Sequence, residues 1–344
     1  MARYEALFDR LGLRDWCDAD STYAPLSMAQ LLAQTQGGEA EAEASGLPFP
    51  SLDTLHEACG RIGQTRDLTE GLENGFLSIR SELKFVLDPI TQPLSWMLDG
   101  TLYVFESAPW WVMMPALLLL TWVVSRSRAV TGFVAFVLLF FAIIDHYAVA
   151  MQTLAIVFVC TGISVLLGVP IGIGMSKSDT AQRSIVPILD LLQTLPTFVY
   201  LIPLIFLFSV TESKLYGIAI ILYAIVPVIR LTDLGIRLVD RDVIEAANAF
   251  GLTAWQKLTR VELPLALPNI MAGVNQTIMM SLAMVVIASL VSAPGLGVLV
   301  LRGIRALDLG VGIVAGLGIV LLAVVLDRVS KAALNRVDTQ AKSK

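Results

Sequence analysis

The stretch Glu245–Pro264, which reads EAANAFGLTAWQKLTRVELP, is a polar segment set between two long apolar runs. Two alanines follow Glu245 and leave a smooth helical surface beside its side chain. Gly251 supplies the backbone freedom that ends a helix and lets the chain turn. The closing Leu-Pro pair is expected to stop a second helical piece before the next apolar run begins. The stretch therefore predicts two short helices joined by a turn.

The composition of the whole chain places this stretch in a membrane protein. Of its 344 residues, 56% are hydrophobic and 15% are charged, and the mean hydropathy is +0.74. Ordinary soluble domains carry about 25% charged residues. The net charge of −5, the pI near 5.1 and the lack of a basic tract give no support for nucleic-acid binding. We expect an all-α integral membrane protein in contact with lipid.

Apolar runs long enough to cross about 30 Å of hydrocarbon, at roughly 20 residues each, predict seven crossings. We place them near residues 109–125, 130–145, 148–175, 188–209, 215–231, 270–292 and 309–327. Lys and Arg collect after the first, third, fifth and seventh runs, which puts the C-terminus in the cytoplasm and the N-terminus outside. Arg302 and Arg305, between the sixth and seventh runs, are exceptions to this bias.

The spacing within the opening stretch resembles the cytoplasmic signature of permease subunits of binding-protein-dependent ABC importers. The matching residues are Glu245, Ala246, Ala247, Gly251, Val261, Leu263 and Pro264, with Val261 where that family more often has Ile. The flanking stretches Leu191–Phe208, Met271–Val291 and Gly295–Gly310 look like the glycine betaine/proline (ProU-type) branch. The resemblance covers roughly residues 148–336 and implies a type I ABC importer permease fold.

What the resemblance implies is a subunit that forms the passage for a solute and leaves ATP hydrolysis to a partner. The implied solute is glycine betaine, proline betaine or a related quaternary-ammonium compound, with choline, a sulfonate or another small solute left open. The implied partners are cytoplasmic ABC ATPase subunits, an extracytoplasmic substrate-binding protein and a second, identical permease chain. The chain has no GxxxxGK[ST] motif with which to bind ATP itself. We therefore expect a non-catalytic subunit without a cofactor.

The resemblance and the composition together divide the chain. We expect an acidic, partly disordered extension (1–75), amphipathic interfacial helices interrupted near Pro89 and Pro93 (76–108), two accessory transmembrane helices (109–146), a permease core (147–336) with a cytoplasmic coupling loop (232–269), and a C-terminal tail (337–344). The three cysteines lack the spacing of a metal site. Cys160 is expected to be inert in an apolar helix. Cys17 and Cys59 pair if the extension is exported and stay free thiols otherwise.

The coupling loop has two interpretations. A short helix that projects into the cytoplasm can seat in a groove of an ATPase subunit and carry rigid-body motion to the crossings that it joins. An amphipathic loop can also rest on lipid headgroups. The motif match favours the coupling role.

Polar residues beside helix breaks are candidates for the translocation pathway. They are Gln193, Thr194, Pro196 and Tyr200 in the fourth run, and Asn275, Gln276 and Ser281 in the sixth. Each of them could equally hold neighbouring helices together. Phe198, Tyr200 and Tyr223 are available for cation–π contact with a quaternary ammonium ion. Glycines in the third run (168, 172, 174) and the seventh (310, 312, 316, 318) are predicted to be helix-packing positions.

Ionisable residues are nearly absent from the centres of the predicted crossings. Those nearby fall at segment ends: Asp145, His146, Asp190, Glu212, Asp308 and Asp327. Proton- or cation-coupled carriers place such groups within the membrane, so a self-powered carrier is disfavoured. A stand-alone osmolyte channel or facilitator, with the polar loop as a gate, remains the alternative from another functional class.

Overall fold

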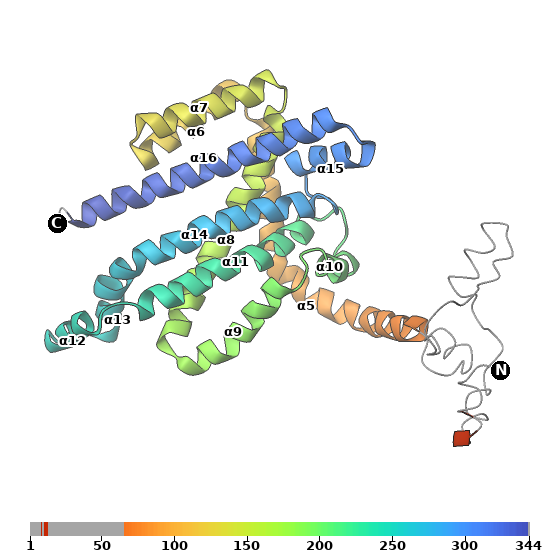
Figure 1. Ribbon diagram of the computed structural model, residues 1–344, viewed down its shortest axis with the longest axis horizontal. Coiled ribbons are helices and arrows are strands. Elements are labelled where there is room, and N and C mark those ends of the chain that lie inside the picture. The colour runs from red at the N-terminus through yellow and green to blue at the C-terminus, as the bar shows by residue number, and fades with distance from the viewer. Residues whose placement is uncertain (1–7, 9, 13–64, 343–344) are drawn as a thin grey trace, which may run out of the picture. The chain divides into compact units, whose positions relative to one another are not determined.

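The computed structural model describes Phe8, Arg10–Gly12 and residues 65–342. Cys17, Cys59 and most of the acidic extension lie outside these described residues. The chain divides into two units, Met1–Glu82 and Leu83–Lys344. Helix α5 begins in the first unit, and the other helices labelled in Figure 1 belong to the second.

The described part from residue 65 onward consists of helices joined by short turns and irregular connections and contains no strand. The helices are α5 (Thr65–Ser107), α6 (Trp110–Ser125), α7 (Arg128–Ile143), α8 (Tyr147–Lys177), α9 (Asp179–Thr194), α10 (Leu201–Leu207), α11 (Ser213–Arg237), α12 (Arg241–Ala249), α13 (Ala254–Lys257), the π-helical turn η1 (Leu258–Glu262), α14 (Leu263–Ala288), α15 (Leu296–Ala306) and α16 (Leu309–Lys342). Helix α16 continues to Lys342, so residues 337–342 of the expected C-terminal tail are helical.

Within the described residues, four helical segments are long and apolar enough to cross a membrane: Tyr147–Lys177, Ser213–Arg237, Ala254–Ala288 and Leu309–Leu334. The number rises to five if α5 and α6, which meet at 115°, count as one broken span. The sequence predicts seven crossings, and two of those correspond to α6 and α7, which have 16 residues each. A helix of that length falls short of the roughly 20 residues that a full crossing needs.

The expected crossing near 188–209 is wrong as a single helix. Helix α9 ends at Thr194, and Leu195 adopts an extended conformation with ψ of 132°. The residue before a proline is pushed away from the helical region, and Pro196 follows Leu195 directly. The chain re-forms only the short helix α10 from Leu201.

The expected interruption of the 76–108 region at Pro89 and Pro93 is also wrong, because α5 runs through both prolines. The break comes instead at Pro109, between α5 and α6. The part of α5 in the second unit is held to the start of α11 by the buried ammonium of Lys214. Its Nζ lies 2.6 Å from Asp88 Oδ1.

Helices α8, α11 and α14 form the packed centre of the second unit, with α11 in contact with both of the others. Glycines allow the close approach. A Cβ added at Gly172 of α8 would lie 2.6 Å from the carbonyl oxygen of Ile229, and one at Gly273 of α14 would lie 3.0 Å from Val228 Cα, both on α11. Small residues at helix contacts are how membrane helices gain packing contacts that lipid does not supply.

The predicted glycine faces are therefore correct in part. Gly168 and Gly172 pack against α11, whereas a Cβ at Gly174 or Gly316 would meet no atom within 4 Å. Gly318 of α16 packs against Phe141 of α7, where an added Cβ would lie 2.9 Å from the ring. Helix α16 contacts α14 as well as the α6–α7 hairpin (Figure 1).

The packed centre gives the first testable prediction. We expect Gly172→Ala to lower the melting temperature of the detergent-solubilised chain, because overfilling a packed site typically costs about 1–3 kcal/mol. Gly174→Ala is the matched control on the same helix. The methyl group added at Gly174 meets no atom within 4 Å, and alanine loses less backbone entropy on folding than glycine does. This control should therefore keep the melting temperature of the wild type. Thermal unfolding followed by intrinsic fluorescence would measure both, and equal melting temperatures for the two variants would contradict this packing.

Candidate functional site

The polar stretch Glu245–Pro264 folds as helix, turn and helix. Helix α12 starts at an acidic cap, where Asp240 Oδ1 accepts a hydrogen bond from the Asp242 backbone N–H at 3.0 Å. It ends at Gly251, whose φ of +72° is left-handed. The backbone N–H of Leu252 then donates to the Ala247 carbonyl at 3.2 Å. The turn that the sequence predicts at Gly251 is present.

The second helical piece differs from the prediction. It begins at a capping box, in which Thr253 and Gln256 each bond the other's backbone N–H. It does not stop at Leu263 and Pro264, because α13, η1 and α14 run on as one helical segment, Ala254–Ala288. The reason lies in η1. The Leu263 N–H donates to the Leu258 carbonyl five residues back, and this wider turn relieves the clash that a proline ring makes inside an α-helix.

The residues of the predicted motif divide into a surface group and a packing group. Glu245, Ala246 and Gly251 are exposed, whereas Ala247 is buried and Val261 and Leu263 are half-buried. Pro264 is exposed in the first turn of α14.

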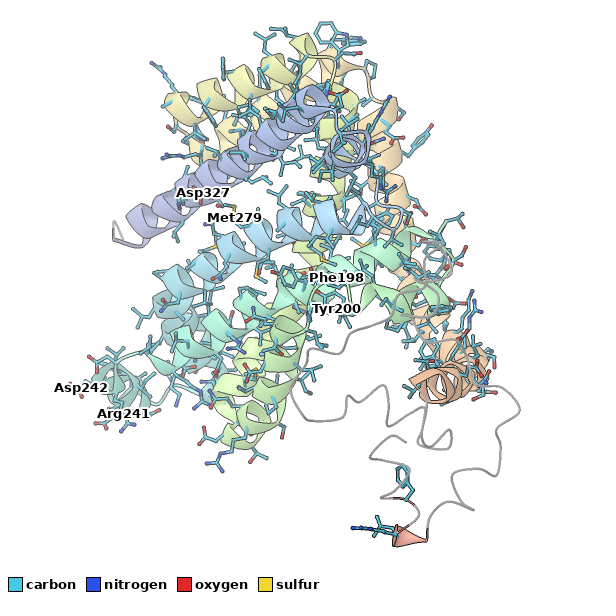
Figure 2. All side chains as sticks on the ribbon, turned by 45° about the vertical axis from the view of Figure 1, so that its right-hand side comes forward. Phe198, Tyr200, Arg241, Asp242, Met279 and Asp327 are labelled. Atoms are coloured by element: carbon cyan, nitrogen blue, oxygen red, sulfur yellow. The ribbon has the colours of Figure 1, made fainter. Side chains whose placement is uncertain are left out.

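Two aromatic side chains that the sequence analysis does not single out are the most prominent feature of this segment. Phe250 is 86% exposed and Trp255 is 72% exposed. They lie on either side of Gly251 in the chain, within the segment of α12 and α13 at one end of the helical bundle (Figure 1), where Figure 2 labels Arg241 and Asp242. Large aromatics left in solvent on a short polar helix pair are typical of a protein-contact surface.

Both ends of the 241–262 segment are tied by ion pairs to the turn between α8 and α9. At the first end, Arg237 Nη1 lies 2.8 Å from Asp179 Oδ1, and Arg237 Nε lies 2.9 Å from Asp233 Oδ1. Arg237 Nη2 also donates to the Met175 carbonyl at 2.8 Å. Gln182 of α9 completes this end by donating to the second oxygen of Asp233 at 2.7 Å.

At the second end, Lys177 pairs with Glu262 of η1, whose carboxylate is buried. We call the two pairs Arg237–Asp179 and Lys177–Glu262 the turn clamp. Because a buried carboxylate without a partner is costly, Glu262 fixes η1 against the end of α8. The partners are 58 and 85 residues apart in sequence. No local pattern could have revealed them, although the mixed charges at Lys177 and Asp179 are visible in the sequence.

The seven predicted pathway residues do not come together in one site. Asn275 donates to Asp327 Oδ1 at 2.9 Å, and Ser281 accepts a hydrogen bond from Thr161 at 3.2 Å, so both hold helices together. Gln193, Thr194, Pro196 and Gln276 are exposed. Tyr200 is buried, and within the described residues its hydroxyl has no hydrogen-bond partner.

The aromatic candidates for cation–π contact are also spread between environments. Phe198 is 59% exposed, Tyr200 is buried and Tyr223 is half-buried. Figure 2 shows Phe198 and Tyr200 close together at the irregular segment between α9 and α10, well away from Arg241 and Asp242. They do not form a cage of exposed rings.

Asp327 closes the apolar run of α16, since the residues from Leu309 to Leu326 carry no charge and Arg328 follows directly. Its carboxylate accepts hydrogen bonds from Asn275 and from Lys331 Nζ, which lies 2.9 Å away. Among the residues that the structure describes, no group of three or more His, Cys, Asp or Glu side chains could hold a metal ion.

Comparison with known proteins gives a consistent result. Residues 164–339 match the family described as binding-protein-dependent transport system inner membrane component. The chain is 39% identical over 308 residues to the glycine betaine/proline betaine transport system permease protein ProW of Escherichia coli (strain K12), covering 87% of this chain and 84% of that protein. It is 40% identical over 247 residues to the glycine betaine/carnitine transport permease protein GbuB of Listeria monocytogenes, covering 71% and 87%.

The fold is also found in a solved structure. Inward-facing forms of the MetNI methionine ABC transporter superpose with a TM-score of 0.50 at 20% identity, covering 54% of this chain and 93% of that chain. A likeness at this level of identity bears on the fold alone.

The turn clamp gives a stability prediction. We expect Lys177→Met to destabilise the chain by about 1–3 kcal/mol, because it leaves the Glu262 carboxylate buried and unpaired. Arg230→Met is the matched control, since Arg230 and Asp190 are 40% and 55% exposed and such pairs contribute about 0–1 kcal/mol.

The double variant Lys177→Met with Glu262→Leu separates the contribution of the ion pair to stability from that of the packing around it. Replacing both partners by apolar side chains should recover part of the loss. Unfolding by sodium dodecyl sulfate in mixed micelles measures all four proteins. A Lys177→Met variant no less stable than Arg230→Met would show that Glu262 does not depend on this partner.

Proposed function

This chain belongs to the family of binding-protein-dependent transport system inner membrane components, the permease subunits of ABC importers, and we propose that the solute it carries is glycine betaine, proline betaine or a related quaternary-ammonium compound. The observation that carries the substrate class is its identity of 39–40% to permeases named for glycine betaine, over most of their length. Proline betaine and carnitine in those names share the quaternary ammonium and the carboxylate of glycine betaine.

In this proposal the 241–262 segment is the contact with the ATPase. Phe250 and Trp255 supply exposed aromatic surface, and Glu245 supplies a charge on the same short helical pair. The left-handed turn at Gly251 fixes the angle between the two helices. Val261, Leu263 and Pro264 act at the join with α14, so that movement of the segment reaches α14 without a flexible joint.

The turn clamp also transmits this movement to the turn between α8 and α9. The segment is covalently continuous with α11 and α14, and through Asp179 and Lys177 it is also bound to the α8–α9 turn. Movement of the segment would therefore reach α8, α9, α11 and α14 together. Residues 147–336 form the permease core in this arrangement, with α6 and α7 as accessory helices on α16.

The remaining parts of the proposal concern assembly. The subunit is non-catalytic, pairs with a second copy of itself, and works with cytoplasmic ATPases and an extracytoplasmic binding protein. Residues 241–262 and the C-terminus face the cytoplasm, and α15 and the N-terminus face outward. This orientation is supported by the basic residues that follow α8 and α11 and those near the end of α16. Of the predicted pathway residues, Gln193, Thr194, Pro196 and Gln276 have exposed side chains that could line a passage between two copies.

The proposal is tested by uptake of radiolabelled glycine betaine into proteoliposomes that hold this chain, its ATPase and its loaded binding protein. We expect ATP-dependent uptake by the wild type and a loss of about tenfold or more in Glu245→Ala and Phe250→Ala, the size expected for residues central to an interface. Both side chains are exposed, so neither change should lower the melting temperature.

Trp96→Ala is the control, since Trp96 is 68% exposed but lies on α5, outside the coupling segment. It should leave co-purification of the ATPase unchanged, whereas Phe250→Ala should weaken it. Uptake that does not depend on ATP and is unchanged in both Glu245→Ala and Phe250→Ala would support a stand-alone facilitator and reject the coupling role.

A further inference from the structure

Tyr200 ends the irregular segment that separates α9 from α10, where Figure 2 shows it beside Phe198. Tyr200 is 9% exposed, and its hydroxyl has no hydrogen-bond partner among the described residues. A buried hydroxyl of this kind has given up its hydrogen bonds to water without gaining one in the protein. Native proteins rarely bury such a group without a use for it.

The position of Tyr200 distinguishes it from other buried hydroxyl groups. Tyr216, the other described tyrosine that is buried, hydrogen-bonds to Ser213. Tyr147 has an unpaired hydroxyl too, but it is only half-buried and lies at the start of α8. Three more buried residues have unpaired hydroxyls within the continuous helices α8, α11 and α14: Ser164, Thr232 and Thr277. Of all these residues, Tyr200 is the one at an interruption between helices.

The irregular segment lies within the depth of the membrane. The proposed orientation puts the turn clamp at the cytoplasmic surface, and α9 starts there at Asp179. The 16 residues of α9 span about 24 Å, less than the roughly 30 Å of hydrocarbon, so the segment begins inside the apolar layer. Irregular backbone at this depth occurs where protein buries it or where it lines a water-filled cavity. Because Pro196, Phe198 and Val199 are exposed, this chain does not bury the segment, and we place it beside the passage between two copies.

Neutral hydrogen-bond donors lie at both ends of the irregular segment. Gln193 has an exposed side-chain amide in the last turn of α9, and Tyr200 has its hydroxyl at the other end. Residues 191–211 include no charged side chain. A tyrosine hydroxyl can donate a hydrogen bond to a carboxylate without placing a fixed charge in the passage. Such a donor binds a zwitterion weakly enough for the solute to leave again, as conduction requires.

Movement of α9 would uncover the Tyr200 hydroxyl. The turn clamp holds the start of α9 through Asp179, whereas α10 contacts α11 and buries its first residue, Leu201. The chain between these two attachments is interrupted at Leu195, which is extended before Pro196. Motion that reaches α9 from the turn clamp is therefore taken up in the irregular segment, next to the Tyr200 side chain.

We propose that the Tyr200 hydroxyl binds the carboxylate of the transported zwitterion, and that movement of α9 uncovers this hydroxyl during the transport cycle. The proposal deepens the function given above and rests on it. It assigns to one buried side chain a contact that the exposed pathway residues do not account for.

The first test is uptake of radiolabelled glycine betaine into proteoliposomes that hold the chain, its ATPase and its loaded binding protein. Tyr200→Phe removes only the hydroxyl, and we expect uptake to fall about tenfold or more, the loss expected for a hydrogen bond to a charged group. The melting temperature should not fall, because the hydroxyl has no partner to lose. Tyr147→Phe, the control variant, removes an unpaired hydroxyl from the start of α8 and should change neither quantity.

The second test asks whether the carboxylate is the group that is bound. Phe198→Cys places a thiol on an exposed position two residues from Tyr200, in a chain that also carries Cys17→Ser and Cys59→Ser. Labelling of this thiol by a methanethiosulfonate reagent is followed in the full assembly with glycine betaine or with choline, which lacks a carboxylate. Glycine betaine should slow the labelling more than choline does. Tyr200→Phe should remove this difference, and the control variant should keep it.

The proposal would be overturned by normal uptake in Tyr200→Phe, by an equal loss in Tyr147→Phe, or by equal protection from glycine betaine and choline. A loss of uptake together with a lower melting temperature would assign the hydroxyl a structural role and also overturn it. If the wild type imports glycine betaine and Tyr200→Phe imports it equally well, the importer stands and the site does not. A wild type without ATP-dependent uptake would instead reject the proposed function, and this site with it.

Discussion

The contact of α11 with α8 on one side and α14 on the other is the constraint on which the rest of the structure depends. In lipid there is no hydrophobic gain from bringing apolar helices together, so association relies on close packing and on hydrogen bonds between helices. Gly172 and Gly273 provide the close packing, and the Thr161–Ser281 hydrogen bond links α8 directly to α14. The other elements attach to this group: α9 and the polar segment at one end, α15 at the other, and α16 along α14.

The two ends of the packed group differ in how they are stabilised. At the end that carries α12 and α13, Arg237 and Glu262 connect segments that are distant in sequence through charged hydrogen bonds. At the other end, α15 is fixed by glycines against neighbouring backbone, and its arginines are left without partners. The end with α12 and α13 thus has paired charges and exposed aromatic rings. The end with α15 has close backbone contacts, and its arginines have no carboxylate partner among the described residues. This contrast suits two different kinds of partner.

Local chemistry explains which features could be predicted from the sequence. The turn at Gly251 follows from the conformation of one residue, and the sequence predicts its position. The break before Pro196 has an equally local cause, although one crossing is expected over residues 188–209. Pro89 and Pro264 do not end their helices, because a helix accommodates a proline when its neighbours allow it, by continuing past the lost hydrogen bond or by widening into a π-helical turn. The pathway residues are hard to identify from the sequence for a different reason. A polar residue such as Asn275 can face a passage or a neighbouring helix, and only the position of Asp327 decides between them.

The position of Asp327 has a consequence for the order in which the protein is made. An unpaired aspartate at the centre of a membrane helix raises the cost of insertion by about 2.5–3.5 kcal/mol, and Asp327, at the end of the apolar run, carries a smaller part of that cost. Its partner Asn275 precedes it by 52 residues, so α14 has been synthesised before α16 leaves the ribosome. Lys331 travels on the same helix and pairs with Asp327 from one turn away. The bond from Asn275 to Asp327 can therefore form as soon as the last span enters the membrane, because synthesis from the N-terminus delivers that span after α14 has been made.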